Sequence, residues 1–178
     1  MAVAVATARR RFTREGYHRM GEVGILKPTE RAPIGPRHAA FIDNLTQLLV
    51  VRLAGRAIVS AQNPVVLADD SEPQPDLKIL RHRSVSYKHR TAAAEDTLLL
   101  IEVAETSLAY DRSTKLRLYA ETGIPEYWVV DGVAESLEVH RAPHAGGYRD
   151  VSRVAGNTAT VSLQEYPDVT LSLAEIFT

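Results

Sequence analysis

The run TLLLIEV at residues 97–103 constrains the fold most, because it places an acidic residue inside an otherwise apolar stretch. Its continuous apolar character is typical of a strand that is buried on both faces, and such a strand needs a covering layer on each side. Glu102 in such a strand costs several kcal/mol unless it is paired or binds a metal. The sequence therefore predicts a layered fold whose inner strand carries a carboxylate of functional interest.

Periodicity and breaker residues predict the other elements. Apolar positions recur at three- and four-residue intervals from residue 36 to Gly55, which predicts a helix, and a second helix is expected over residues 108–122. The stretch 81–96 is expected to be a loop or a frayed helix. Strands are predicted over residues 56–60, 64–67, 76–80, 97–103, 126–130, 136–141, 148–154, 159–163 and 169–171. Together these elements predict a mixed α/β domain with a central sheet flanked by at least two helices.

Composition narrows the possible chemistry. The chain has 178 residues, a formal net charge of -1 and no cysteine, which fits one domain over residues 1–178, with residues 1–8 expected to be disordered. Without cysteine, any metal would be bound by oxygen or imidazole. We expect a cytoplasmic protein without a signal peptide or membrane span, since no apolar run approaches the ~20 residues that a span requires. Nucleic-acid binding would depend on local basic patches.

Acids at strand ends point to metal-dependent hydrolysis. If the strands of Asp76 and Glu102 are adjacent, both carboxylates project at one end of the sheet and can hold Mg²⁺ through oxygen ligands, as phosphodiester hydrolysis requires. Lys115 shares a helix face with Asp111 and can lean over the strand ends, where its ammonium would stabilise charge on a pentavalent phosphorane. Gln62, in the turn before the second strand, is expected to add a neutral contact.

The stretch 81–96 carries a group of cations that are candidates for contacts with nucleic-acid phosphates, with Tyr87 as a stacking ring. An exposed charged loop also needs no such explanation. The candidate contact residues are Arg81, Arg83, Lys88 and Arg90.

Each candidate also has a structural interpretation. An aspartate after proline, as at position 76, is typical of a turn with an Asx hydrogen bond. Glu102 would then form a structural ion pair with Arg112 or Lys115. His38 lies on the apolar face of the first helix and is typical of a hydrogen-bonded core or rim residue, and Tyr119 is typical of the core.

Six motifs follow one another along the chain. They are Gly35-Pro36-Arg37-His38, Gln62-x-Pro64, Pro75-Asp76, Ile101-Glu102-Val103, Asp111-x-x-x-Lys115-x-x-x-Tyr119 and Gly123-Ile124-Pro125-Glu126-Tyr127-Trp128-Val129-Val130-Asp131. With these motifs in this order, the chain from Arg11 to the C-terminus resembles the Uma-two family of restriction endonucleases, a branch of the PD-(D/E)XK nuclease superfamily. The resemblance implies a restriction-endonuclease-like mixed central sheet flanked by helices, and an endonuclease acting on DNA with Mg²⁺, for which Mn²⁺ can substitute.

The resemblance also implies roles for single residues. Asp76 and Glu102 would bind the metal, and Lys115 would complete the catalytic site. The superfamily's E-x-K element would place its lysine where this chain has Ala104, so the lysine role would have moved to the following helix. Supporting roles are expected for Gln62, His38 and Tyr119.

The N-terminal region departs from the family pattern. Members usually carry a strand hairpin with an acid between a G-I-L-x-P segment and the G-P-x-H helix, whereas residues 29–34 of this chain pass directly to that helix. Such a deletion would shorten the strand region, leave Glu22 or Glu30 as substitutes for the acid, and expose a sheet edge that favours a homodimer. Three functions stay open: a Mg²⁺-dependent endonuclease, a weakened or inactive nuclease fold that binds nucleic acid or a protein, and an interaction domain unrelated to nucleic acid.

Overall fold

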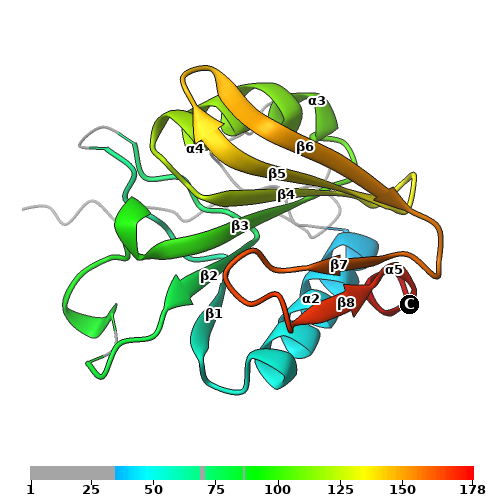
Figure 1. The fold of residues 1–178 in the computed structure, drawn as a ribbon, viewed down its shortest axis with the longest axis horizontal. Coiled ribbons are helices and arrows are strands. Elements are labelled where there is room, and N and C mark those ends of the chain that lie inside the picture. The colour runs from blue at the N-terminus through cyan, green and yellow to red at the C-terminus, as the bar shows by residue number, and fades with distance from the viewer. Residues whose placement is uncertain (1–34, 69–70, 86) are drawn as a thin grey trace, which may run out of the picture. The chain divides into compact units, whose positions relative to one another are not determined.

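The computed structural model describes residues 35–68, 71–85 and 87–178. Within these ranges the chain forms a six-stranded sheet in the order β1-β2-β3-β4-β5-β6 (Figure 1). Neighbouring strands are antiparallel, except that β3 and β4 run parallel. The sheet and its flanking helices confirm the mixed α/β prediction. The strands are β1 Ala57–Ala61, β2 Leu77–Arg81, β3 Thr97–Ala104, β4 Glu126–Asp131, β5 Ser136–His144 and β6 Gly147–Ala155.

Strand β3 lies inside the sheet, and all eight of its residues are buried. Leu99 and Ile101 pack in the core layer that contains α2 (Pro36–Leu53), whereas Leu100 packs in the layer on the opposite face. Side chains alternate along a strand, so Glu102 points to the same face as Leu100. The predicted burial of this strand on both faces is confirmed, and its acid lies under the second layer.

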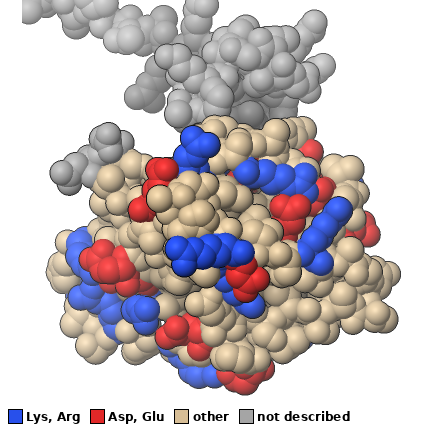
Figure 2. Space-filling view, turned by 45° about the horizontal axis from the view of Figure 1, so that its top comes forward, with Lys and Arg blue, Asp and Glu red and all other residues tan. Residues whose placement is uncertain are grey.

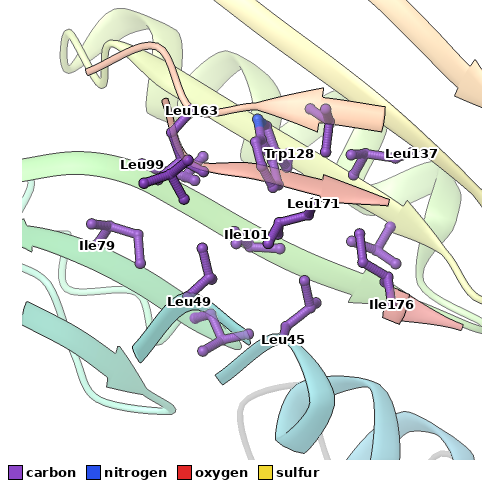
Figure 3. Packing of buried hydrophobic residues seen from close by; sticks show 14 of the residues in the cluster. Leu45, Leu49, Ile79, Leu99, Ile101, Trp128, Leu137, Leu163, Leu171 and Ile176 are labelled. Carbon is purple, nitrogen blue, oxygen red and sulfur yellow. The ribbon is translucent and has the colours of Figure 1, made fainter. Parts of the chain in front are cut away.

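The core on the α2 face joins segments that are far apart in sequence (Figure 3). A two-stranded sheet of β7 (Thr160–Ser162) and β8 (Thr170–Ser172) packs there, and α5 (Leu173–Ile176) follows it. The sequence analysis did not predict α5, although its first turn has a capping box in which the Ser172 and Glu175 side chains bond each other's main-chain N–H. The labelled core residues of Figure 3 are Leu45, Leu49, Ile79, Leu99, Ile101, Trp128, Leu137, Leu163, Leu171 and Ile176.

The opposite face is covered by one helical run in three parts. These are α3 (Leu108–Tyr110), a π-helical turn over Asp111–Lys115 and α4 (Leu116–Glu121). The helix predicted over residues 108–122 is confirmed, but the π turn was not foreseen. The Leu116 N–H donates to the Asp111 carbonyl in this turn. Short π segments inside α-helices are frequently found at functional sites.

Two expectations change between β1 and β3. The strand predicted over residues 64–67 is wrong: Val66 forms only an isolated bridge with Ala93, and the preceding Pro64 cannot donate a ladder hydrogen bond. The loop expected over residues 81–96 contains two short 3-10 turns, Tyr87–His89 and Ala94–Asp96.

Several expectations lie outside the described residues: the disorder of residues 1–8, the shortened hairpin over residues 29–34, and Glu22 and Glu30 as substitute acids. The single-domain boundary and the homodimer also stay predictions. None of the helices in the described ranges combines the length and the apolar character of a membrane span.

Candidate active site

Adjacent strands bring Asp76 and Glu102 together. Asp76 directly precedes β2. The antiparallel β2–β3 register pairs Leu77 with Ile101, so Asp76 and Glu102 lie opposite each other at the neighbouring position. The Asp76 main-chain N–H donates to Glu102 Oε2 at 3.4 Å, and the Val103 N–H donates to Asp76 Oδ2 at 2.9 Å. The condition set by the sequence, adjacency of the two strands, is therefore met.

Glu102 is buried among polar partners, with 2% of its surface exposed. Its Oε1 accepts a hydrogen bond from the Tyr119 hydroxyl at 2.7 Å, and its Oε2 lies 2.9 Å from Lys115 Nζ. Burial raises the pKa of Glu102 to about 7; Lys115 opposes this rise, and the charges of Asp76 and Asp111 add to it. The site therefore holds an ionised Glu102 only at a free-energy cost, which is typical of functional carboxylates.

Lys115 lies between two carboxylates. Its Nζ is 3.0 Å from Asp111 Oδ1, which makes a close ion pair, and Asp111 is 1% exposed. Burial alone would lower the pKa of Lys115, but Glu102 and Asp111 hold it above its ordinary value. The sequence analysis gave Asp111 no site role, although its i,i+4 spacing to Lys115 was the available signal. Arg112 does not pair with Glu102; it donates to Glu138 at 2.7 and 3.1 Å.

His38 contacts the site from α2. Its Nε2 lies 3.2 Å from Asp76 Oδ1, so both oxygens of Asp76 have a partner. Burial lowers the pKa of His38, but the hydrogen bond to Asp76 and the charges of Asp76, Glu105 and Glu102 together leave the pKa above its ordinary value. The rim position and the hydrogen bond expected for this histidine are both present, and its partner is the candidate metal ligand.

Gln62 reaches the site through its main chain. Its N–H donates to the Asp76 carbonyl at 2.9 Å, and its own carbonyl accepts from the Gln74 side chain. The backbone φ of Gln62 is +48°, so the chain turns sharply directly after β1. Within the described residues the Gln62 side chain makes no hydrogen bond to the carboxylates, so the expected side-chain contact is absent from this arrangement.

The donor set suits a hard cation. Mg²⁺ is commonly bound by one or two carboxylates and several waters, and Asp76 and Glu102 supply two carboxylates at neighbouring positions. The Asp76 side chain is 18% exposed, so a hydrated cation can reach it from solvent. Among the described residues, no three His, Asp or Glu side chains are grouped closely enough to enclose a metal. A Mg²⁺ ion here would therefore have Asp76, Glu102 and water as ligands.

The candidate phosphate contacts separate into two groups. Arg83 and Arg90 approach the buried Asp96 at 3.4 and 2.6 Å, and Arg81 lies 3.5 Å from Glu165. These arginines therefore have partners within the domain. Lys88 is exposed. Figure 2 shows cationic and anionic side chains interleaved on the face in view, consistent with the near-zero net charge.

Comparisons with known proteins identify the family and the fold. The model of the Uma2 family, described as "Putative restriction endonuclease", matches residues 27–174. A crystal structure titled as a "putative nuclease belonging to DUF820" from Anabaena variabilis ATCC 29413 shares the fold, with a TM-score of 0.65, 16% sequence identity and coverage of 83% of each chain. Among curated proteins, none is significantly similar in sequence. At 16% sequence identity, this structural similarity supports the fold alone.

Proposed function

The chain belongs to the Uma2 family, and from this premise we propose that it is a Mg²⁺-dependent endonuclease that hydrolyses phosphodiester bonds in DNA. The observation that carries the proposal is the grouping of Glu102 with Lys115, 2.9 Å apart, beside Asp76 at the ends of β2 and β3. Two carboxylates and one ammonium are the residue types that metal-assisted phosphoryl transfer requires.

Asp76 and Glu102 are the residues that would hold Mg²⁺. When bound, the cation would supply Lewis acidity, which would offset the charge that develops on the phosphate oxygens and make water a better nucleophile. The protein fixes both ligands: the Val103 N–H and His38 restrain Asp76, and Tyr119 restrains Glu102. Such restraint of ligating carboxylates is the usual role of neighbouring hydrogen-bond partners at metal sites.

Lys115 acts as a fixed cation in this proposal. Because its pKa lies above the ordinary value, it stays protonated at neutral pH and does not serve as a general base. Its ammonium would stabilise the negative charge that develops on the phosphate oxygens during attack. Asp111 holds the ammonium beside Glu102, so Lys115 needs little rearrangement during the reaction.

Plasmid nicking tests the proposal. Purified full-length protein is expected to nick supercoiled DNA with Mg²⁺ or Mn²⁺, and Asp76→Ala or Glu102→Ala should abolish nicking while circular dichroism shows a folded protein. Arg149→Gln, which changes an exposed cation of β6, is the matched control and should nick as the wild type does. If the wild type never cuts above the level of both alanine variants, the chain is a non-catalytic nuclease fold, and the enzyme proposal is wrong.

A further inference from the structure

A cavity of about 580 Å³ lies over β1 and β2, outside the cluster of Asp76, Glu102 and Lys115. Ile58 and Leu80 face each other across the two strands in its lining, as do Ser60 and Lys78. The segment from Tyr87 to Ala92 supplies another side. This volume falls within the range of roughly 300–1,000 Å³ that is usual for ligand sites.

The cavity shares a sheet face with the candidate active site. Lys78 pairs in register with Leu100, which packs in the same core layer as Tyr119, the hydrogen-bond partner of Glu102. Lys78 also lies two residues after Asp76, about 7 Å along an extended strand. A nucleic-acid strand held at Asp76 and Glu102 therefore has the cavity beside it.

Lys78 brings a buried positive charge to this cavity. It is 2% exposed, and its Nζ donates to the main-chain oxygens of Asn63, at 3.0 Å, and Pro64. No carboxylate of the described residues lies within ion-pair distance of it, and a lysine ammonium has three N–H donors. One donor is left for an anionic ligand, whose charge would offset the desolvation of the ammonium.

The rest of the lining matches a nucleotide. Lys88 and His89 are exposed, and no Asp or Glu is among the described residues that line the cavity. Ile58 and Leu80 give the same cavity an apolar surface. Cations beside an apolar surface suit a ligand that carries a phosphate next to a flat base.

We propose that this cavity binds one nucleotide of the DNA strand, next to the bond that is cut. Lys78 and Lys88 contact its phosphate, and its base lies against Ile58 and Leu80. The inference rests on the proposed function in taking DNA as the ligand, but binding at the cavity needs neither Asp76 nor a metal.

Equilibrium DNA binding tests the cavity separately from catalysis. Full-length protein is titrated against a short fluorescein-labelled duplex in EDTA over a series of salt concentrations, and affinity is measured by fluorescence anisotropy. Lys88→Gln and Lys78→Met are each expected to weaken binding and to reduce the slope of log K against log salt by about 1. Arg149→Gln should keep the wild-type affinity and slope. Thymidine 5′-monophosphate should compete with the duplex more strongly than inorganic phosphate, because the base adds apolar contact.

Each outcome decides the proposal. Wild-type affinity and salt slope in Lys88→Gln would overturn it, as would a wild type that binds no DNA, or equal competition by phosphate and the nucleotide. Lys88 is exposed, so its variant decides the matter even if Lys78→Met fails to fold. If Lys88→Gln binds DNA more weakly but neither the wild type nor any variant nicks DNA, the proposed function is refuted and the cavity proposal is retained. If the wild type nicks DNA but Lys88→Gln binds DNA as the wild type does, the cavity proposal is refuted and the proposed function is retained.

Discussion

Two buried carboxylates, Asp96 and Glu102, lie beside cations, yet their pKa values shift in opposite directions. Burial raises the pKa of Asp96, but the hydrogen bonds from Arg90 and the Ala93 N–H, together with the charges of Arg90 and Arg83, leave the pKa below its ordinary value. Burial raises the pKa of Glu102 to about 7 although Lys115 opposes it.

Depth of burial and hydrogen bonding explain the difference: the Asp96 side chain is 8% exposed and the Glu102 side chain 2%. Arg90 donates to both oxygens of Asp96, at 2.6 and 2.8 Å, and among the described residues its planar guanidinium is shared with no second buried acid. Glu102 shares one ammonium with Asp111 and faces the further charge of Asp76. The Asp96 cluster stabilises the loop over residues 81–96, while the Glu102 cluster keeps negative charge at a cost that a bound cation would remove.

The largest expected effect separates the two clusters by activity. Lys115→Met removes the cation beside Glu102 and should lower the nicking rate by about 100-fold or more, the usual scale for losing one electrostatic contact to the transition state. Initial rates at saturating Mg²⁺ measure this change. Arg117→Met, an exposed cation on the same helical run, should leave the rate unchanged. A Lys115→Met rate within a few-fold of the wild type would remove Lys115 from the active site.

Asp96→Asn should affect stability instead. The substitution removes a charge-assisted pair with Arg90 and is expected to lower the free energy of unfolding by about 2 kcal/mol. Urea denaturation followed by circular dichroism measures the loss. The folded variant should nick DNA at the wild-type rate, and a large drop in its rate would show that the two clusters are not separate.

The pH dependence of stability should also have opposite signs at the two sites. The folded-state pKa of Asp96 is below its ordinary 3.8, so its contribution to stability is present above that pH and disappears as the pH falls through the folded-state value. The folded-state pKa of Glu102, about 7, exceeds 4.5, so its contribution declines as the pH rises from 4.5 through 7.

Metal-free unfolding curves of wild type, Asp96→Asn and Glu102→Gln at several pH values measure this contrast. The destabilisation by Asp96→Asn should shrink in acid, whereas Glu102→Gln should gain stability relative to wild type as the pH rises through 7. A difference between wild type and Glu102→Gln that stays constant over this range would show that the Glu102 pKa is not raised.

Tyr119→Phe should give the smallest effect. It removes the hydroxyl that donates to Glu102 Oε1 at 2.7 Å and leaves the ring packed. The loss of one hydrogen bond to a positioned carboxylate is expected to cost about 1 kcal/mol, which corresponds to a roughly fivefold slower rate. Nicking rates over a range of Mg²⁺ concentrations measure it, and raised Mg²⁺ should recover part of the loss. An unchanged rate at low Mg²⁺ would mean that Tyr119 does not position Glu102.

The sequence predicted those parts of the site that depend on patterns within single elements. A charged residue in an apolar strand identified Glu102, and helical spacing placed Lys115 above the strand ends. The pairing of Glu102 with Asp76 depends on the adjacency of their two strands. The sequence did not show this adjacency; the β2–β3 register does.

Other features depend on contacts between elements and could not be predicted in this way. In the sequence, Asp96 is only the last residue of a stretch rich in cations. Its ion pairs with Arg83 and Arg90 form only when that stretch is folded. The π turn at Asp111–Lys115 has no distinct periodicity in so short a segment. Lys78 interrupts the apolar run of β2, so it could have been identified in the same way as Glu102, as a charged residue in an apolar strand. Its burial and its place beside a cavity, however, depend on the segments around it.

Metal titration tests the account of the Glu102 cluster most directly. Isothermal titration of the full-length protein with Mn²⁺ should show one binding event in the wild type and in Asp96→Asn, and none in Asp76→Asn or Glu102→Gln. That result would show that the carboxylate with the raised pKa binds the cation while the carboxylate with the lowered pKa does not. Equal Mn²⁺ binding by wild type and Glu102→Gln, or no binding by the wild type, would contradict the account.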